Sequence, residues 1–101
     1  MIPNYDKIKR YLYIHQDRKC PVCKKIMLYN EKLDLHHRVN NSKWRRKKYP
    51  LFINSLLNLV LLHNTCHLKM GRFLQLTDYR ANKIELFLQK HKKIAEWVNN
   101  P

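Results

Sequence analysis

The sequence has little of what marks disordered, secreted or membrane proteins. Its 101 residues include one glycine and four prolines, with no low-complexity tract, so we expect a folded chain. It shows neither a secretory signal at the amino terminus nor a run of about 18 apolar residues. We therefore expect a protein of the cytoplasm or another reducing intracellular compartment, neither secreted nor inserted in a membrane.

Acidic residues are also scarce. Seven Asp and Glu stand against 21 Lys and Arg, which gives a formal net charge of +14. On so small a protein this charge would repel itself unless it lies against a polyanion, and nucleic acid is the expected partner. An anionic membrane surface is disfavoured because the basic residues do not form an amphipathic helix with a free apolar face.

Three cysteines are an odd number, which argues against a disulfide framework. Cys20 and Cys23 form a Cys-x-x-Cys pair, and His63 and Cys66 repeat its spacing. Two such pairs from distant parts of the chain can close one tetrahedral zinc site, which would also stabilise a chain with a small core. A redox pair or unrelated buried thiols are the alternatives for the first pair, and His67 is the alternative fourth ligand.

Hydrophobic periodicity in the first half predicts a helix, a hairpin and a long loop. The helix is expected over residues 5–16, where apolar side chains recur at helical spacing. The two hairpin strands are expected over 26–29 and 33–37, joined by a polar turn. A loop then begins at about residue 40. No repeat or linker divides this part of the chain from the next.

The second half predicts a strand and two helices. The apolar run 58–63 has the composition of a buried strand. A helix capped by Asn64 or Thr65 follows, and a last helix is capped by Thr77 or Asp78. One face of that last helix carries Ala81, Ile84, Leu88, His91, Ala95 and Val98.

Three histidines and an asparagine follow a particular order along these elements. His36 and His37 end a predicted strand, Asn58 opens the apolar strand, and His67 lies at the start of the next helix. In this order, residues 20 to about 75 resemble the HNH endonuclease family, in the subgroup whose ββα-metal core, or His-Me finger, is braced by a four-ligand zinc. The resemblance implies two strands and one helix around a single divalent ion.

Carried over to this chain, the resemblance makes His36 and His67 ligands of a catalytic metal ion and His37 the general base. Asn58 becomes the residue that fixes the strand and orients the base. These residue types suit phosphodiester hydrolysis, which needs a cation at the scissile phosphate and a base for the attacking water. Since neighbours in a strand point to opposite faces, the strand is expected to end or kink where both His36 and His37 approach one phosphate.

Two positions depart from common family patterns. Many members carry an acidic residue where His36 stands, and some carry a further histidine where this chain has Gly71. With two protein ligands, water and phosphate would complete the coordination, which favours Mg²⁺ or Mn²⁺ and leaves Zn²⁺ or Ni²⁺ as alternatives. Asn54 and Asn64 are rivals to Asn58, which we prefer because it opens the apolar strand.

A dense basic segment lies in the predicted loop. Five cations and one tryptophan occupy six residues: Lys43, Trp44, Arg45, Arg46, Lys47 and Lys48. Charge runs are often only solvated faces, but the position just after His37 favours contact with phosphates. Trp44 would then stack on a base or sugar, so this segment is predicted to bind nucleic acid.

Together these features predict one α+β HNH nuclease domain over residues 1–101, with a core over about 18–76 and flanking helices over about 5–16 and 78–98. It would hydrolyse phosphodiester bonds in DNA, double-stranded in the simplest case, with a structural Zn²⁺ and a catalytic divalent ion. A zinc-ribbon module that binds DNA without cutting it, and an RNA-directed nuclease or toxin with the same centre, are the alternatives. A homodimer through the last helix is left open.

Overall fold

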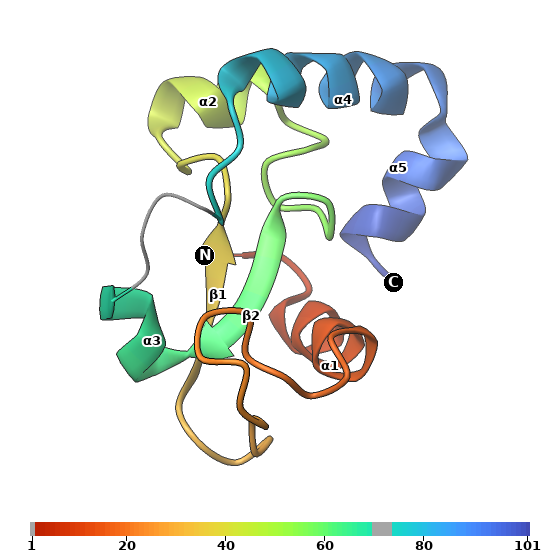
Figure 1. Ribbon diagram of the computed structural model, residues 1–101. Coiled ribbons are helices and arrows are strands. Elements are labelled where there is room, and N and C mark those ends of the chain that lie inside the picture. The colour runs from red at the N-terminus through yellow and green to blue at the C-terminus, as the bar shows by residue number, and fades with distance from the viewer. Residues whose placement is uncertain (1, 70–73) are drawn as a thin grey trace.

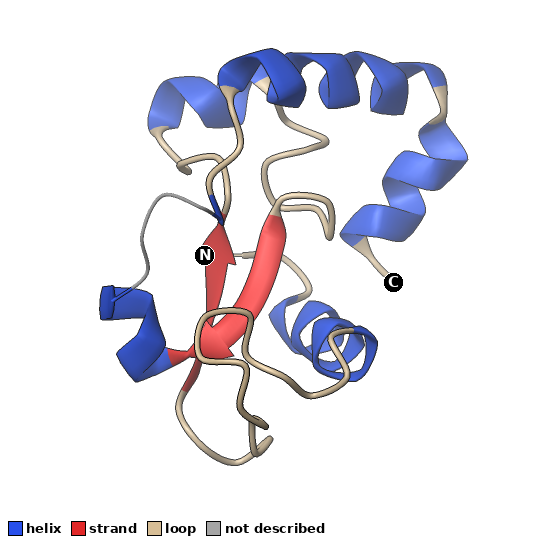
Figure 2. Ribbon diagram, viewed as in Figure 1, coloured by secondary structure: helices blue, strands red, loops and turns tan. Residues whose placement is uncertain are grey.

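Two short strands lie at the centre of the molecule with helices around them (Figures 1 and 2). The structure is a computed structural model and describes residues 2–69 and 74–101. Along the chain the elements are α1 (Tyr5–His15), β1 (Leu33–His37), α2 (Lys43–Lys48), β2 (Leu59–His63), α3 (Asn64–Lys69), α4 (Asp78–Lys90) and α5 (Lys92–Asn99). These elements form a small, compact α+β unit. None of the helices in the described ranges is long and apolar enough to cross a membrane.

The two strands pair antiparallel over their whole length. Leu33 lies opposite His63 at one end of the pair, and His37 lies opposite Leu59 at the other. The second edge of β2 is covered by a side chain, because Gln16 donates to the carbonyl of Leu61 at 2.7 Å and accepts from its N–H at 2.9 Å. α3 begins at the residue after β2 and contacts both strands. The strand pair and α3 therefore form one packed unit.

The predicted hairpin between residues 26–29 and 33–37 is wrong. The segment 33–37 does form a strand, but its partner is β2, which comes from the other half of the chain. Ile26 instead makes an isolated bridge with Lys19. In 26–29 only Met27 is buried, so this apolar run folds back over the cysteine turn and does not extend the sheet.

The basic segment predicted as a loop is the helix α2. Its first backbone hydrogen bond runs from Arg46 N–H to the carbonyl of Ser42, and its last runs from Tyr49 N–H to Arg45. Lys and Arg have high intrinsic helix propensity, and neither glycine nor proline interrupts the six residues. The sequence predicted a loop here, whereas the short run between Ser42 and Pro50 is helical.

The last predicted helix is two helices with a break at His91. Of the two predicted caps, Thr77 and Asp78, the structure has Thr77 at the start of α4, where its hydroxyl accepts from Arg80 N–H at 3.2 Å. At His91 the backbone leaves helical geometry (φ −123°, ψ 72°), and α5 turns back toward α1, as Figure 1 shows. A hydrogen bond of 2.8 Å from Leu56 N–H to the Val98 carbonyl holds α5 there. The break lets one apolar stripe bury residues on both helices.

Buried side chains form two clusters. The first joins α1, the cysteine turn, the strands and α3: Ile8, Leu12, Cys20, Met27, Leu33, Leu59, Leu61, Leu62 and Cys66. The second joins the segment around α2 to α4 and α5: Val39, Tyr49, Phe52, Ile53, Ala81, Leu88, Ala95 and Val98. The helix predicted to start at residue 64 forms through Lys69. Its predicted continuation through residues 70–73 lies outside the described residues.

Candidate metal centres and cavity

Four sulfur and nitrogen donors meet where β2 passes into α3. The ligand atoms of Cys20, Cys23, His63 and Cys66 all lie within 4.8 Å of one another, and the cysteines are not disulfide-bonded. His63 Nδ1 is 3.4 Å from Cys23 Sγ and 3.8 Å from Cys66 Sγ. Zinc–sulfur bonds of about 2.3 Å and zinc–nitrogen bonds of about 2.0 Å put neighbouring tetrahedral ligands about 3.6 Å apart. The four residues predicted from the sequence could thus hold a structural metal such as zinc.

The local fold of the first pair explains how its sulfurs come together. Cys20 N–H donates to the Lys25 carbonyl at 2.9 Å, and Lys24 N–H donates to the Cys20 carbonyl at 2.9 Å. This tight turn forces Lys24 into the left-handed region, at φ 65°. Such a backbone is disfavoured for a residue with a Cβ atom, so the surrounding hydrogen bonds must hold it.

The cluster has one acidic thiol and one weakly acidic thiol. Burial tends to raise the pKa of Cys20, but hydrogen bonds from the backbone N–H groups of Cys23, His63 and Val22 outweigh it and lower that pKa to about 6. Burial and the neighbouring cysteine sulfurs raise the pKa of Cys66 to about 11. Cys20 is therefore ready to bind as a thiolate, whereas Cys66 would release its proton on metal binding.

A cavity of about 530 Å³ lies at the other end of the strand pair. Its walls include His36, His37 and His67, together with Arg45 and Asp78. The rings of His36 and His67 have centroids 5.1 Å apart and are inclined by 68°. β1 ends at His37, as predicted, and both neighbouring histidines line the same cavity. The three histidines singled out from the sequence are thus brought together.

His36 carries an unusual buried atom. In residues 2–69 and 74–101, its Nε2 is the one buried side-chain nitrogen or oxygen that has no hydrogen-bond partner. Burial, with the nearby His67, His37 and Arg38, lowers the pKa of His36 to about 4. A neutral imidazole whose buried nitrogen has no partner fits a metal ligand, because an unpaired buried polar atom is otherwise costly. His36 and His67 therefore suit a divalent ion held by two protein ligands.

His37 contacts Asn54, one of the two rivals that the sequence left beside Asn58. The distance from His37 Nε2 to Asn54 Oδ1 is 2.8 Å. Burial lowers the pKa of His37, while this hydrogen bond acts in the opposite direction. With Oδ1 as the acceptor, Nε2 carries the hydrogen and Nδ1 keeps the lone pair. Asn54 thus sets the orientation of this ring.

Asn58 has a different place. Its side chain is fully buried, and Oδ1 accepts from Val39 N–H at 2.7 Å. Its Nδ2 donates to the carbonyls of Val39 at 3.2 Å and Ile53 at 2.9 Å. Asn58 therefore ties the chain leaving β1 to the chain entering β2 through backbone groups, whereas Asn54 contacts the ring of His37. Asn54 lies in an irregular segment without periodicity, so no local pattern distinguishes it.

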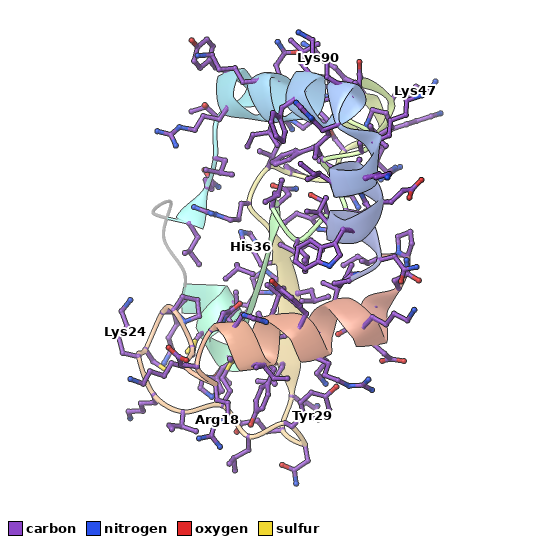
Figure 3. The ribbon with its side chains drawn as sticks, turned by 90° about the vertical axis from the view of Figure 1, so that its right-hand side faces the viewer. Arg18, Lys24, Tyr29, His36, Lys47 and Lys90 are labelled. Carbon is purple, nitrogen blue, oxygen red and sulfur yellow. The ribbon has the colours of Figure 1, made fainter. Side chains whose placement is uncertain are left out.

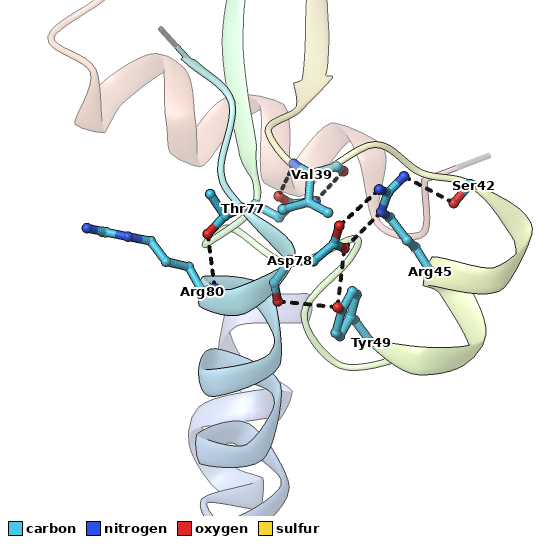
Figure 4. A network of polar contacts seen from close by, with 8 residues as sticks. Val39, Ser42, Arg45, Tyr49, Thr77, Asp78 and Arg80 are labelled. Atoms are coloured by element: carbon cyan, nitrogen blue, oxygen red, sulfur yellow. Dashed lines mark hydrogen bonds and ion pairs between the residues drawn. The ribbon is translucent and has the colours of Figure 1, made fainter. Parts of the chain in front are cut away.

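The basic helix α2 is not uniform. Arg45 forms a two-point ion pair with Asp78, with Nε–Oδ1 and Nη2–Oδ2 distances of 3.0 Å (Figure 4). Its guanidinium also lies 4.5 Å from the centroid of the Trp44 ring. The hydroxyl of Tyr49 also donates to Asp78 at 3.2 Å. The hydrogen bonds from Arg45 hold the pKa of Asp78 below its usual value. Arg45 is thus held in place by Asp78, and both residues line the cavity.

The other predicted binding residues of this segment are exposed. They are Lys43, Trp44, Arg46, Lys47 and Lys48. Figure 3 shows Lys47 projecting at the helical end of the molecule, with His36 near its middle and Lys24 on the cysteine turn. Arg45 lines the cavity, so the exposed cations of the same helix, α2, lie close to it.

Comparisons with known proteins add nothing to these observations. No family model matches the chain, and searches of curated proteins and of solved structures found no match. The residues of the two sites therefore carry the functional interpretation.

Proposed function

We propose that this protein is a metal-dependent endonuclease of the HNH type that hydrolyses phosphodiester bonds in DNA. The observation that carries the proposal is the meeting of His36, His37 and His67 at one cavity, with an unpartnered buried nitrogen on His36. In this proposal β1, β2 and α3 are the ββα-metal core. The Cys20, Cys23, His63 and Cys66 cluster holds a structural zinc beside it.

His36 and His67 would hold the catalytic divalent ion in this mechanism. Mg²⁺ or Mn²⁺ suits a site with two protein ligands completed by water and phosphate, and Zn²⁺ or Ni²⁺ is the alternative. When bound, such an ion supplies positive charge at the scissile phosphate. His36 would contribute its Nε2, which is buried and has no hydrogen-bond partner.

His37 takes the proton of the attacking water. The water oxygen bonds to phosphorus as the bond from phosphorus to the leaving sugar oxygen breaks, and the proton passes to the imidazole. Asn54 holds Nε2 at 2.8 Å, which leaves Nδ1 as the proton acceptor. Asn58 contributes indirectly, because it fixes the backbone just after His37.

The charge distribution supports an anionic polymer as substrate. The chain carries a net charge of +14. Exposed cations of α2 flank Arg45, which lines the cavity. Phosphate contacts from Lys and Arg give affinity without sequence preference. DNA and RNA share this chemistry, so RNA is the substrate to compare.

The test is cleavage of supercoiled plasmid and of a single-stranded RNA by the full chain loaded with zinc. Mg²⁺ or Mn²⁺ should support nicking of the plasmid, and EDTA should stop it. His37→Ala should remove cleavage, by about 10²-fold or more, whereas His15→Ala, an exposed histidine on α1, should not. Nicking that persists in His37→Ala would overturn its role as the base. A folded parent that binds DNA but cuts neither substrate with any metal would favour a zinc-binding module without catalysis.

A further inference from the structure

The turn before β1 supplies a carboxylate to a histidine of the cysteine cluster. Glu31 Oε1 lies 2.8 Å from His63 Nε2. The same oxygen accepts from Leu28 N–H at 2.8 Å, so the carboxylate is fixed by the backbone of its own turn. This contact was not expected from the sequence.

Three residues further along, a second carboxylate meets a histidine of the cavity. Asp34 Oδ2 lies 3.0 Å from His67 Nδ1. Asn64 Nδ2 donates to the same oxygen at 2.9 Å, which joins β1 to the first residue of α3. Each carboxylate thus has one histidine and one further hydrogen bond.

The two contacts engage different ring nitrogens. An ionised carboxylate only accepts hydrogen bonds, so the nitrogen that faces it carries the hydrogen and the other nitrogen keeps the lone pair. For His63 the lone pair is then on Nδ1, which lies 3.4 Å from the sulfur of Cys23. For His67 it is on Nε2, in a ring that lies edge to face with His36.

We propose that Glu31 and Asp34 are positioning residues that assign opposite ring nitrogens to the two centres: Nδ1 of His63 to the cysteine cluster and Nε2 of His67 to the cavity. The part that concerns His67 rests on the proposed function. The part that concerns His63 rests on the cysteine cluster alone.

The assignment would prevent the two histidines from exchanging places, because they are close in sequence and either can bind zinc. His67 directly follows Cys66, so its ring could compete for the ion that Cys66 binds. Asp34 occupies the Nδ1 of His67 and ties that ring to β1. Glu31 fixes the ring of His63 with Nδ1 toward the sulfurs. The carboxylates would thereby keep each imidazole at its own centre.

The direct test is long-range ¹H–¹⁵N NMR of the imidazoles in the full chain loaded with one equivalent of Zn²⁺. We expect His63 to carry its hydrogen on Nε2 and bind through Nδ1. We expect His67 to carry its hydrogen on Nδ1. The opposite tautomer at either residue would overturn the assignment for that residue. The NMR result does not depend on the cleavage assay. A protein that cuts neither nucleic acid but shows the expected tautomers would refute the proposed nuclease and leave the assignment standing.

Variants then separate the two carboxylates. Co²⁺ bound to thiolates absorbs through sulfur-to-metal charge transfer, so it reports the cysteine cluster alone. Glu31→Ala should weaken Co²⁺ binding there about 10- to 100-fold, the usual cost of losing such a partner. Glu31→Gln, which keeps an acceptor oxygen, should restore most of it, and Asp34→Ala should leave it unchanged. Equal affinity in Glu31→Ala and the parent, or equal weakening by Asp34→Ala, would contradict the division.

Discussion

The cysteine cluster and the histidine cavity lie at opposite ends of the same strand pair, yet they are built differently. The cluster has four donors from the chain, within 4.8 Å of one another, and thus a complete tetrahedral set. The cavity combines the imidazoles of His36, His37 and His67 with about 530 Å³ of open space. A closed ligand set stabilises structure, whereas an open one leaves room for water and substrate. His63 ends β2 and His67 lies in α3, so residues only four apart in the sequence belong to the two different sites.

Removing the metal from the cysteine cluster should have the largest effect on the whole molecule. Cys20 and Cys66 belong to the first core cluster, so the ion would join the cysteine turn, β2 and α3. Structural zinc contributes on the order of 10 kcal/mol to the folding of small zinc domains. We expect Cys23→Ser or a strong chelator to lower the melting temperature sharply in circular dichroism. An unchanged melting curve after verified metal removal would rule out a structural zinc.

Single histidine variants should separate the two centres. His63→Ala should lose bound zinc, measured by native mass spectrometry, and should unfold at lower temperature. His67→Ala should keep its zinc but cleave DNA no faster than the protein without added divalent ion. The reason is that His63 approaches two sulfurs, while His67 approaches His36. Loss of zinc from His67→Ala would show instead that His67 is a ligand of the cluster.

Variants of Asn58 and Asn54 should also separate stability from cleavage, with smaller effects than the histidine variants. Asn58→Ala removes three hydrogen bonds from a fully buried side chain and should lower the free energy of unfolding by about 2–3 kcal/mol in urea titrations. Asn54→Ala should cost less than about 1 kcal/mol because this side chain is half-buried. It should nevertheless slow cleavage by releasing the ring of His37. Equal destabilisation by both variants would contradict the division of roles.

The exposed cations of α2 should affect binding and little else. Lys47→Ala combined with Lys48→Ala should weaken DNA binding and reduce the slope of log affinity against log salt by about 2, since each phosphate contact contributes about 0.9. Zinc content and melting temperature should match the parent, because neither side chain is buried. Lys90→Ala with Lys93→Ala, two exposed cations of α4 and α5, is the matched control. Equal salt slopes for both double variants would show that α2 has no special role.

Much of the framework was predictable because it has local causes. The helix over residues 5–16, the strand over 33–37 and the apolar strand over 58–63 correspond to α1, β1 and β2. The first two follow from side-chain periodicity within one segment, and the third follows from a continuous apolar run. The metal cluster was predictable for another local reason, since the two-residue spacings of Cys20 with Cys23 and of His63 with Cys66 each suit a turn around one ion.

The partners of these segments were not predictable from local pattern. The strand 33–37 was assigned to residues 26–29, which are near in sequence, but it pairs with β2. The choice of strand partner depends on how the strand pair packs against α1 and α3, and the pattern within one segment does not contain that information. Similarly, the break at His91 follows from where α5 can pack, since the apolar stripe continues through it.

The sequence by itself determined which donors the protein has, how they are spaced and how strongly the chain is charged. Only the tertiary structure decided that His63 and not His67 joins the cysteines, that Arg45 is paired with Asp78, and that Asn54 approaches His37 while Asn58 bonds the backbone. It also brought Glu31 and Asp34 to the two histidines. The physical reason is that hydrogen bonds form between atoms within about 3 Å, and long-range packing sets those distances.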